Sequence, residues 1–318
     1  MRALILGARG FVGEAVRREL LRLDPATEPV CVTRGAPPEG DEGPWVELDV
    51  ARAPEARTRR ALESAAPDVV VNCAGLVNGS RRALVDANAR VVLHLLEAVS
   101  GMRQPPRIVQ IGSAAEYGEG SPGRPIRPTD PAHPRGAYGL TKLIATELVT
   151  AAAADGLDAM VLRVFNPLGP GAPEHTLGGV AARRIHDALA LGRDQVELGP
   201  LDAFRDFVDI RDVARAVALA CRADGLAGTV LNVGSGTAVT ARMVVGALVA
   251  ASGYGGRIVE HGAGSDRSQQ VSWQEADVGP IRRLLGWRAE IPLERSVADL
   301  WTSLASAPPA TALSGNAA

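Results

Sequence analysis

The fold of this chain is decided by one stretch near its start, Leu4-Ile5-Leu6-Gly7-Ala8-Arg9-Gly10-Phe11-Val12-Gly13. An apolar run leads into three glycines with the spacing GxxGxxG, and the periodicity that follows predicts a helix over residues 12–23. A glycine turn between a strand and a helix is the context in which this spacing binds a dinucleotide. The alternative interpretation is a glycine-rich turn that binds no ligand.

Each glycine of this motif has a separate task in a dinucleotide-binding turn. Gly7 would permit the tight turn, Gly10 would let the backbone approach a pyrophosphate, and Gly13 would let helix and strand pack closely. The first turn of the helix would present oriented N–H groups to the phosphates. The residues expected to contact the cofactor here are Gly7, Arg9, Gly10, Phe11 and Val12.

Short β-branched runs alternate with helical patterns through the first half of the chain. Strands are expected at residues 3–6, 30–33, 46–48, 69–72, 108–111 and 160–164, and helices at 12–23, 54–66, 81–99 and 138–155. Strands that alternate with helices predict right-handed crossovers and a parallel sheet with helices on both faces. The expected fold class is α/β, a Rossmann doubly wound parallel sheet.

The alternation becomes irregular after residue 165, where Gly and Pro accumulate. A helix at 176–191 and a strand at 196–198 indicate a smaller lobe, whereas a helix at 212–223 and a strand at 229–233 resemble the first half again. We therefore expect a nucleotide-binding domain from residues 1–165 and 208–234, interleaved with an α/β substrate-binding lobe from 166–207 and 235–305. The small, polar residues 306–318 predict a disordered tail.

The composition is that of an ordinary globular protein, with 318 residues, 46% hydrophobic residues and a net charge of −2. No polybasic run offers a surface to nucleic acid, so no nucleic-acid partner is expected. No apolar run reaches the roughly 18 to 20 residues of a membrane span, so no membrane association is expected. The three cysteines form no CxxC pair, and no signal-peptide pattern occurs, which together predict reduced thiols and a cytoplasmic location.

The second strand ends in Thr33-Arg34, where NAD-binding proteins usually carry an acidic residue for the ribose. Arg34, together with Arg9, could bind a 2′-phosphate through charge-assisted hydrogen bonds, which favours NADP(H), with NAD(H) as the alternative. The other interpretation is two solvated arginines. Further cofactor contacts are expected after the third strand, at Asp49 and Val50, and after the fourth, at Cys73, Ala74 and Gly75.

The residues with the chemistry of catalysis are Ser113, Tyr138 and Lys142. Tyr138 and Lys142 stand four residues apart at a helix start, so both project from one face. The lysine cation would favour the phenolate and make Tyr138 a better proton shuttle, and Ser113 could hydrogen-bond a substrate oxygen. A YxxxK pair alone is weak, but its position after the glycine motif and the strand-end serine favours the functional interpretation.

These motifs together resemble the extended short-chain dehydrogenases/reductases, the NAD-dependent epimerase/dehydratase family. The resemblance includes LRVFNPLGPG at 162–171, RDFVDIRD at 205–212 and LGW at 285–287. It implies a nucleotide-diphosphate sugar substrate, a role for Asn88 in holding the active site together, and a homodimer formed through the helices at 81–99 and 138–155. The substrate contacts that it implies are Ser113, Ala114, Tyr138, Asn166, Arg205 and, more weakly, Arg267.

Dehydratases of this family carry an Asp-Glu pair directly after the position of Ser113, and this chain has Ala114-Ala115 there. The pattern is most similar to the GDP-4-keto-6-deoxymannose reductases. It implies that NADPH reduces the 4-keto group of a GDP- or dTDP-linked 4-keto-6-deoxyhexose, with Tyr138 giving the proton and Lys142 holding the nicotinamide ribose. The alternatives are a nucleotide-sugar 4-epimerase with tightly bound NAD and a non-catalytic, cofactor-sensing scaffold.

Other conspicuous residues receive more ordinary interpretations. His94 is expected to be a satisfied core or boundary residue, and Trp273 and Trp287 to be packing residues. Glu116 could orient the site or be a loop carboxylate. No metal is expected, because His133, His175 and His186 have no metal-ligand spacing. His175 borders the expected sugar site, and its role stays open.

Overall fold

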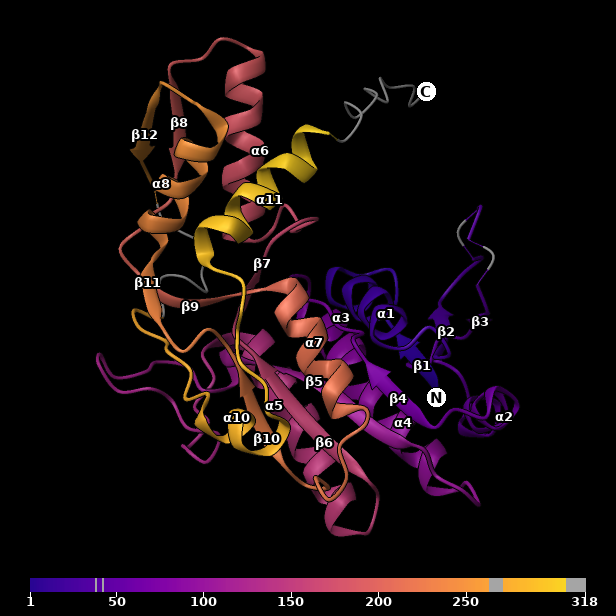
Figure 1. The fold of residues 1–318 in the computed structure, drawn as a ribbon. Helices are drawn as coiled ribbons and strands as arrows, with labels where there is room; N and C mark the ends of the chain where they lie inside the picture. The colour runs from indigo at the N-terminus through magenta and orange to yellow at the C-terminus, as the bar shows by residue number, and fades with distance from the viewer. Residues whose placement is uncertain (38, 42, 263–270, 307–318) are drawn as a thin grey trace.

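The computed structural model describes residues 1–306 except 38, 42 and 263–270 (Figure 1). Arg267 and residues 307–318 of the predicted tail therefore lie outside the described residues. Among the helices of the described chain, none has the length and apolar character that crossing a membrane requires.

A seven-stranded parallel sheet forms the centre of the larger unit, in the order β10-β6-β5-β4-β1-β2-β3. Its middle strand β4 is apolar throughout its first three residues, which are at most 1% exposed because helices cover both faces. The predicted Rossmann fold is thus confirmed. The strands are β1 (Arg2–Leu6), β2 (Glu28–Thr33), β3 (Trp45–Glu47), β4 (Val69–Asn72), β5 (Arg107–Ser113), β6 (Ala159–Val164) and β10 (Val230–Val233).

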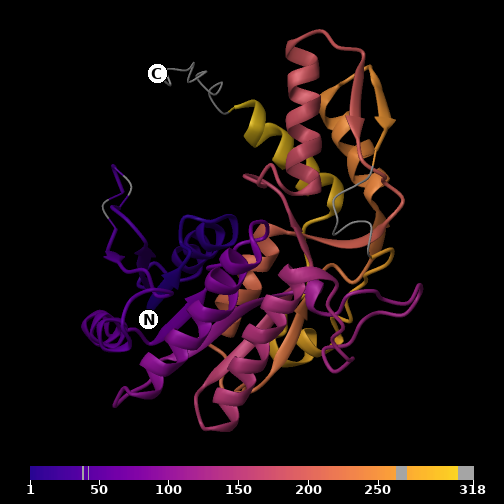
Figure 2. The same cartoon turned by 180° about the vertical axis from the view of Figure 1, so that it is seen from behind.

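Side chains of successive strand residues enter two separate cores. Ala3 and Ile5 pack with α1 (Phe11–Leu23), α7 (Ile210–Ala220) and α10 (Gly279–Leu285). Leu4 and Leu6 pack with the helices of the other face, α2 (Glu55–Ala65), α4 (Val91–Ser100) and α5 (Gly136–Ala154). Figures 1 and 2 show these two helical layers from opposite sides. The sheet is therefore covered on both faces, as its apolar strands require.

The helix predicted over residues 81–99 is interrupted in the structure. It consists of α3 (Arg81–Leu84), a π-helical turn (Val85–Arg90) and α4. Such turns insert a residue into the helical ladder and are frequent at functional sites. Asn88 lies inside this turn and is 1% exposed, so the irregularity falls on a residue that the family resemblance singled out.

A smaller unit begins just after the carboxyl end of β6: its first strand, β7, starts two residues after β6 ends. It contains a three-stranded sheet of order β11-β9-β7 and a two-stranded sheet of β12 and β8, packed with three helices (Figure 1). The elements are β7 (Asn166–Leu168), α6 (Leu177–Ala190), β8 (Gln195–Leu198), β9 (Phe204–Asp209), β11 (Ala238–Thr240), α8 (Ala241–Ser252), β12 (Arg257–Glu260) and α11 (Leu293–Ala305).

One late segment returns to the nucleotide-binding core. Ile281 of α10 and Trp287 are fully buried with α1 and α7, and the Trp287 indole donates to the carbonyl oxygen of Asp212 at 2.9 Å. Trp287 is a packing residue, as expected. Residues 279–287 therefore pack with the Rossmann sheet although they follow most of the lobe in sequence.

Candidate active site

The β1–α1 turn lies backbone to backbone against the end of β4. Gly7 has φ +72°, and a Cβ at this position would come within 3.0 Å of the Cys73 and Ala74 backbone. A Cβ at Gly13 would likewise lie within 3.0 Å of the Gly7 carbonyl oxygen. Gly10 caps α1 without a side-chain hydrogen bond, which leaves the N–H groups of the first helical turn available to a ligand. This arrangement fits a dinucleotide pyrophosphate.

The other expected cofactor contacts lie around this turn. Arg9 and Arg34 are exposed and follow neighbouring strands, since Leu6 pairs with Val32 in the sheet. Asp49 accepts a hydrogen bond from the Ala51 backbone at 3.1 Å. The carbonyl of the buried Val50 lies 3.0 Å from Nδ1 of His94, so His94 is a satisfied boundary residue.

Ser113 ends β5 and begins a short 3-10 turn, Ala114–Glu116. Its hydroxyl accepts a hydrogen bond from the Ala115 N–H at 3.2 Å, and its own N–H donates to Glu116 Oε1 at 2.7 Å. Ser113 is half-buried, whereas Glu116 is 0% exposed. Glu116 is therefore no exposed loop carboxylate: it is the last residue of this turn, and its buried side chain accepts from the Ser113 backbone.

Helix α5 brings the other two predicted catalytic residues to this turn. Tyr138 is half-buried in its first turn, and the Lys142 ammonium, 5% exposed, donates to the carbonyl oxygen of Ile111 on β5. A Cβ at Gly139, next to Tyr138, would lie within 3.0 Å of the Ala115 carbonyl oxygen. The start of α5 and the Ser113 turn are thus in direct contact.

Lys142 stands out in the composition as well as in the fold. The sequence contains 34 Lys and Arg residues, and all except Lys142 are arginine. An ammonium is a compact point charge, whereas a guanidinium is a wide planar fork. The one position where this chain uses lysine is therefore a buried one beside the predicted site.

A chain of buried amides connects Lys142 to the cofactor side of the sheet. The Ile111 carbonyl also accepts from Gln110 Nε2 at 2.8 Å, and Asn72 Nδ2 donates to Gln110 Oε1 at 2.8 Å. A Cβ at Gly75, just past β4, would be 3.9 Å from Lys142 Nζ. Sequence reasoning missed Gln110, although an amide inside an apolar strand was a visible signal.

Asn88 ties the π-helical turn to α5. Its Nδ2 donates to Thr141 Oγ1 at 3.0 Å and to the Leu76 carbonyl at 2.9 Å, and its Oδ1 accepts from the Leu76 N–H at 2.8 Å. Thr141 in turn donates to the Tyr138 carbonyl at 2.9 Å. The Asn88 amide therefore joins α5, the helix that carries Tyr138 and Lys142, to the Leu76 backbone in the loop after β4.

The residues expected to bind the diphosphate lie together in the lobe. Asn166 starts β7, pairs with Phe207 of β9, and donates through Nδ2 to the Asp206 carbonyl at 2.9 Å. Arg205 precedes Asp206, and its guanidinium donates to the carbonyls of Phe204 at 2.8 Å and Val271 at 2.6 Å. The structure thus places Asn166 and Arg205 on adjacent strands.

The lobe also reaches the serine turn through a residue that sequence reasoning missed. Gln274 is 5% exposed, and its Nε2 donates to the carbonyls of Ala114 at 2.9 Å and Gly118 at 2.8 Å. Trp273 beside it packs on Phe204, with ring centroids 4.6 Å apart, which agrees with a packing role. The Ser113 turn is therefore held from the lobe as well as from the sheet.

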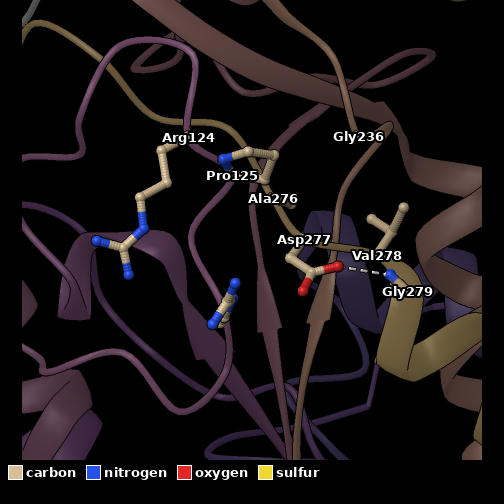
Figure 3. A pocket seen from close by; sticks show the side chains of 8 residues that line it. Arg124, Pro125, Gly236, Ala276, Asp277, Val278 and Gly279 are labelled. Atoms are coloured by element: carbon tan, nitrogen blue, oxygen red, sulfur yellow. Dashed lines mark hydrogen bonds between the residues drawn. The ribbon is translucent and has the colours of Figure 1, made fainter.

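A separate hollow of about 350 Å³ lies between the loop after β5 and the start of α10 (Figure 3). Figure 3 shows the Asp277 carboxylate accepting from the Gly279 N–H, at 2.8 Å. None of the predicted site residues lines it; the lining residues are Arg124, Pro125, Arg127, Gly236, Ala276, Asp277, Val278 and Gly279. Across the described chain, no cluster of three or more His, Cys, Asp or Glu side chains could hold a metal ion.

Comparison with known proteins gives the same family as the motifs. The profile of the NAD dependent epimerase/dehydratase family matches residues 3–234. The dTDP-6-deoxy-L-talose 4-dehydrogenase (NAD(P)(+)) of Kitasatospora kifunensis is 38% identical over 310 residues, covering 96% of this chain and 96% of that protein. The GDP-6-deoxy-D-mannose reductase of Pseudomonas aeruginosa is 29% identical over 240 residues, 73% of this chain and 78% of the reductase.

Solved structures agree with these sequence relatives. MoeE5 in complex with UDP-glucuronic acid and NAD superposes with a TM-score of 0.82 at 26% identity, covering 96% of this chain and 100% of MoeE5. The glycine turn, the Ser113 turn and the start of α5 thus belong to a fold shared over nearly the whole chain. The chain belongs to the NAD dependent epimerase/dehydratase family, the extended short-chain dehydrogenases/reductases.

Proposed function

We propose that this protein is an NAD(P)H-dependent 4-ketoreductase that acts on a nucleotide-linked 4-keto-6-deoxyhexose. The observation that carries the proposal is the contact between the α5 start and the Ser113 turn, together with Ala114-Ala115 in that turn. A dTDP carrier is favoured over GDP, because the relative named for dTDP-6-deoxy-L-talose covers 96% of the chain at 38% identity.

The cofactor residues support a dinucleotide bound at the carboxyl ends of β1 and β4. The phosphates would lie over Gly7 and Gly10 at the start of α1, at the point where the strand order of the sheet reverses. Arg9 and Arg34 flank the adenosine end, which favours NADP(H), with NAD(H) as the alternative. When bound, the nicotinamide supplies or accepts the hydride at C4 of the sugar.

The protein's own groups handle the proton and the orientation. Tyr138 donates its phenolic proton to the carbonyl oxygen at C4 as that oxygen becomes a hydroxyl, and Ser113 donates a hydrogen bond to the same oxygen. The Lys142 cation stabilises the phenolate that is left. Asn166 and Arg205 hold the distant diphosphate, so that binding energy from the non-reacting end orients the sugar.

The turn after Ser113 argues against dehydration. The methyl groups of Ala114 and Ala115 cannot exchange protons, whereas water elimination needs an acid and a base. Glu116 cannot replace them, because its side chain is 0% exposed and its carboxylate accepts hydrogen bonds from Arg163, Thr146 and the Ser113 N–H. The residues that remain are sufficient for hydride transfer coupled to one proton transfer.

Direct assay tests this proposal. The protein is given a dTDP-4-keto-6-deoxyhexose or its GDP counterpart, and consumption of NADPH or NADH is followed by absorbance. Interconversion at C4 without net cofactor consumption would instead support the 4-epimerase, and absence of turnover with every sugar would reject both enzymes. Tyr138→Phe should abolish turnover and retain cofactor binding; unchanged cellular function of that variant would support the scaffold alternative.

We also propose that the protein is a homodimer formed through α3–α4 and α5. Four large apolar side chains on these helices are 38–50% exposed. Two of them are eight residues apart on the run from α3 to α4, and the other two are four residues apart on α5. Two adjacent apolar stripes on packed helices are typical of a helix–helix interface. The residues are Val85, Leu93, Leu140 and Ile144.

A further inference from the structure

The carboxylate of Glu116 joins three elements of the proposed active site. Oε1 accepts from the Ser113 N–H at 2.7 Å, and Oε2 accepts from Arg163 Nε of β6 at 2.6 Å and from Thr146 Oγ1 of α5 at 2.8 Å. All three partners donate, which is the environment that an ionised carboxylate needs. A buried group bonded in this way determines the relative positions of its partners.

Thr146 connects this carboxylate to the other catalytic side chains. It follows Lys142 by four residues and Tyr138 by eight, so the three residues lie on one face of α5. The same carboxylate therefore holds the backbone of Ser113 and the helix that presents Tyr138 and Lys142. A shift of about 1 Å between reacting groups can lower a rate by about 100-fold.

Glu116 also balances a buried charge close to the site. The Arg163 side chain is 5% exposed, and its guanidinium carbon lies 4.5 Å from the ring centroid of Tyr117. The charged and titratable groups that face Glu116 in the described structure are Arg163 from β6, Lys142 from α5 and Tyr117 from its own turn. Burial raises the pKa of Glu116, and the charge of Arg163 opposes this effect.

We infer that Glu116 is a positioning residue of the reaction, an inference that rests on the proposed 4-ketoreductase function. It fixes the Ser113 turn relative to α5, and it neutralises Arg163, so that the cation acting on Tyr138 is Lys142. A carboxylate with only a structural role would contribute to stability and leave the ionisation of Tyr138 unchanged.

The variant Glu116→Gln separates these roles, because it keeps the size of the side chain and removes its charge. We expect kcat to fall roughly 10- to 100-fold with KM for the sugar changed less than about three-fold, since the reacting groups are misplaced while the diphosphate contacts remain. Without the Glu116 charge, the Arg163 cation favours the phenolate form of Tyr138, which cannot donate a proton. The loss of reductase activity at high pH should therefore begin at a lower pH than in the wild type. In Glu116→Gln/Arg163→Met both charges are absent, and the pH profile should return to that of the wild type.

A second readout does not depend on the sugar. The chain has three tyrosines, and Tyr117 and Tyr254 are at most 5% exposed. Ultraviolet titration of phenolate, with matched Tyr138→Phe variants subtracted, reports the ionisation of Tyr138. The midpoint of the Tyr138 titration should move to lower pH in Glu116→Gln and return to its wild-type pH in Glu116→Gln/Arg163→Met. This measurement distinguishes failure of the inference from failure of the proposed function, because it needs no substrate.

Asp212→Asn is the matched control. Asp212 is 2% exposed, forms an ion pair with Arg215, and accepts from the N–H groups of Glu290 and Ile291 at 2.9 Å, on the α7 side of the sheet. It should lower the melting temperature without moving the Tyr138 titration. If Glu116→Gln behaves in the same way, or if the double variant leaves the shift in place, the inference is overturned.

The variant Glu116→Asp covers the case in which the amide does not fold. It keeps the charge and shortens the side chain, so kcat should fall while the Tyr138 titration stays at its wild-type pH. A wild-type kcat in Glu116→Asp would overturn the positioning role.

Discussion

The ammonium of Lys142 donates a hydrogen bond to the carbonyl oxygen of Ile111, two residues before Ser113 on β5. This contact joins the helix that carries the proposed acid to the strand that carries the proposed hydroxyl. The same carbonyl also accepts from Gln110, so its orientation is determined on two sides. The position of Lys142 is thus set by the sheet as well as by its own helix.

The variant Lys142→Arg should lose most activity although it keeps the positive charge. The side chain is 5% exposed, and a planar guanidinium needs more room than an ammonium. We expect kcat to fall roughly 100-fold or more, within the range for loss of assisted proton transfer. Steady-state kinetics with NADPH checks this, with circular dichroism as the control for folding. Near-normal kcat would contradict a role that depends on the ammonium.

The variant Arg34→Ala should reduce the preference for the phosphorylated cofactor. Arg34 follows β2 directly, where a 2′-phosphate on the adenosine ribose would accept its hydrogen bonds. Loss of a charge-assisted hydrogen bond of about 1.5–3 kcal/mol corresponds to a roughly 10- to 100-fold rise in KM for NADPH. KM for NADH should change less than about two-fold. Equal effects on both cofactors would show that Arg34 does not contact the phosphate.

The variant Gln274→Ala should affect both stability and turnover. The Gln274 amide donates to the carbonyls of Ala114 and Gly118. In the variant both buried carbonyls would lose this donor. We expect unfolding to become easier by about 2 kcal/mol and kcat to fall several-fold as the Ser113 turn loosens. Urea denaturation and kinetics measure the two effects. Gln195→Ala on the exposed side of β8 is the control and should be neutral.

The stability of the protein should depend on pH through Asp206. Burial raises the pKa of Asp206 to about 6, although Ser235, Ala276 and Gly236 donate hydrogen bonds to its carboxylate. An aspartate in the unfolded chain titrates near pH 3.9, so from about pH 4 to 6 the folded protein keeps a proton that the unfolded chain has lost. Rising pH therefore favours unfolding over this window.

Comparison with Asp206→Asn isolates this contribution, because the amide does not titrate. The unfolding free energy of the wild type, taken relative to that of the variant, should fall by about 2 kcal/mol as the pH rises from about 4 to about 6. Denaturation at a series of pH values measures it. A difference that stays constant would mean that Asp206 titrates alike in both states.

The variant Leu140→Arg should dissociate the proposed dimer. Leu140 is 50% exposed on α5, and a charge in the middle of an apolar interface would be buried without a partner. Light scattering should show a monomer for this variant and a dimer for the wild type. Leu191→Arg, at a 62% exposed residue just past α6, is the matched control and should leave the mass unchanged. A monomeric wild type would contradict the proposal.

Much of the fold was predictable from short stretches of sequence. The GxxGxxG turn, the alternation of strands and helices, and the order of Ser113, Tyr138 and Lys142 depend on residues close together in the chain. The predicted β4 matches the observed strand Val69–Asn72, and the predicted start of α1 differs by one residue. Local patterns of this kind suffice because side-chain periodicity and glycine turns are short-range properties.

Contacts between distant segments were decided only by the tertiary structure. The partner of Glu116 is Arg163, 47 residues away, and the two meet because the β5–β6 register places Gly112 opposite Arg163. The same holds for Gln274, which reaches Ala114 across 160 residues, and for Arg205, whose guanidinium bonds the Val271 carbonyl. Sequence periodicity specifies which face of a strand a side chain takes, but the register between strands depends on how the whole core packs.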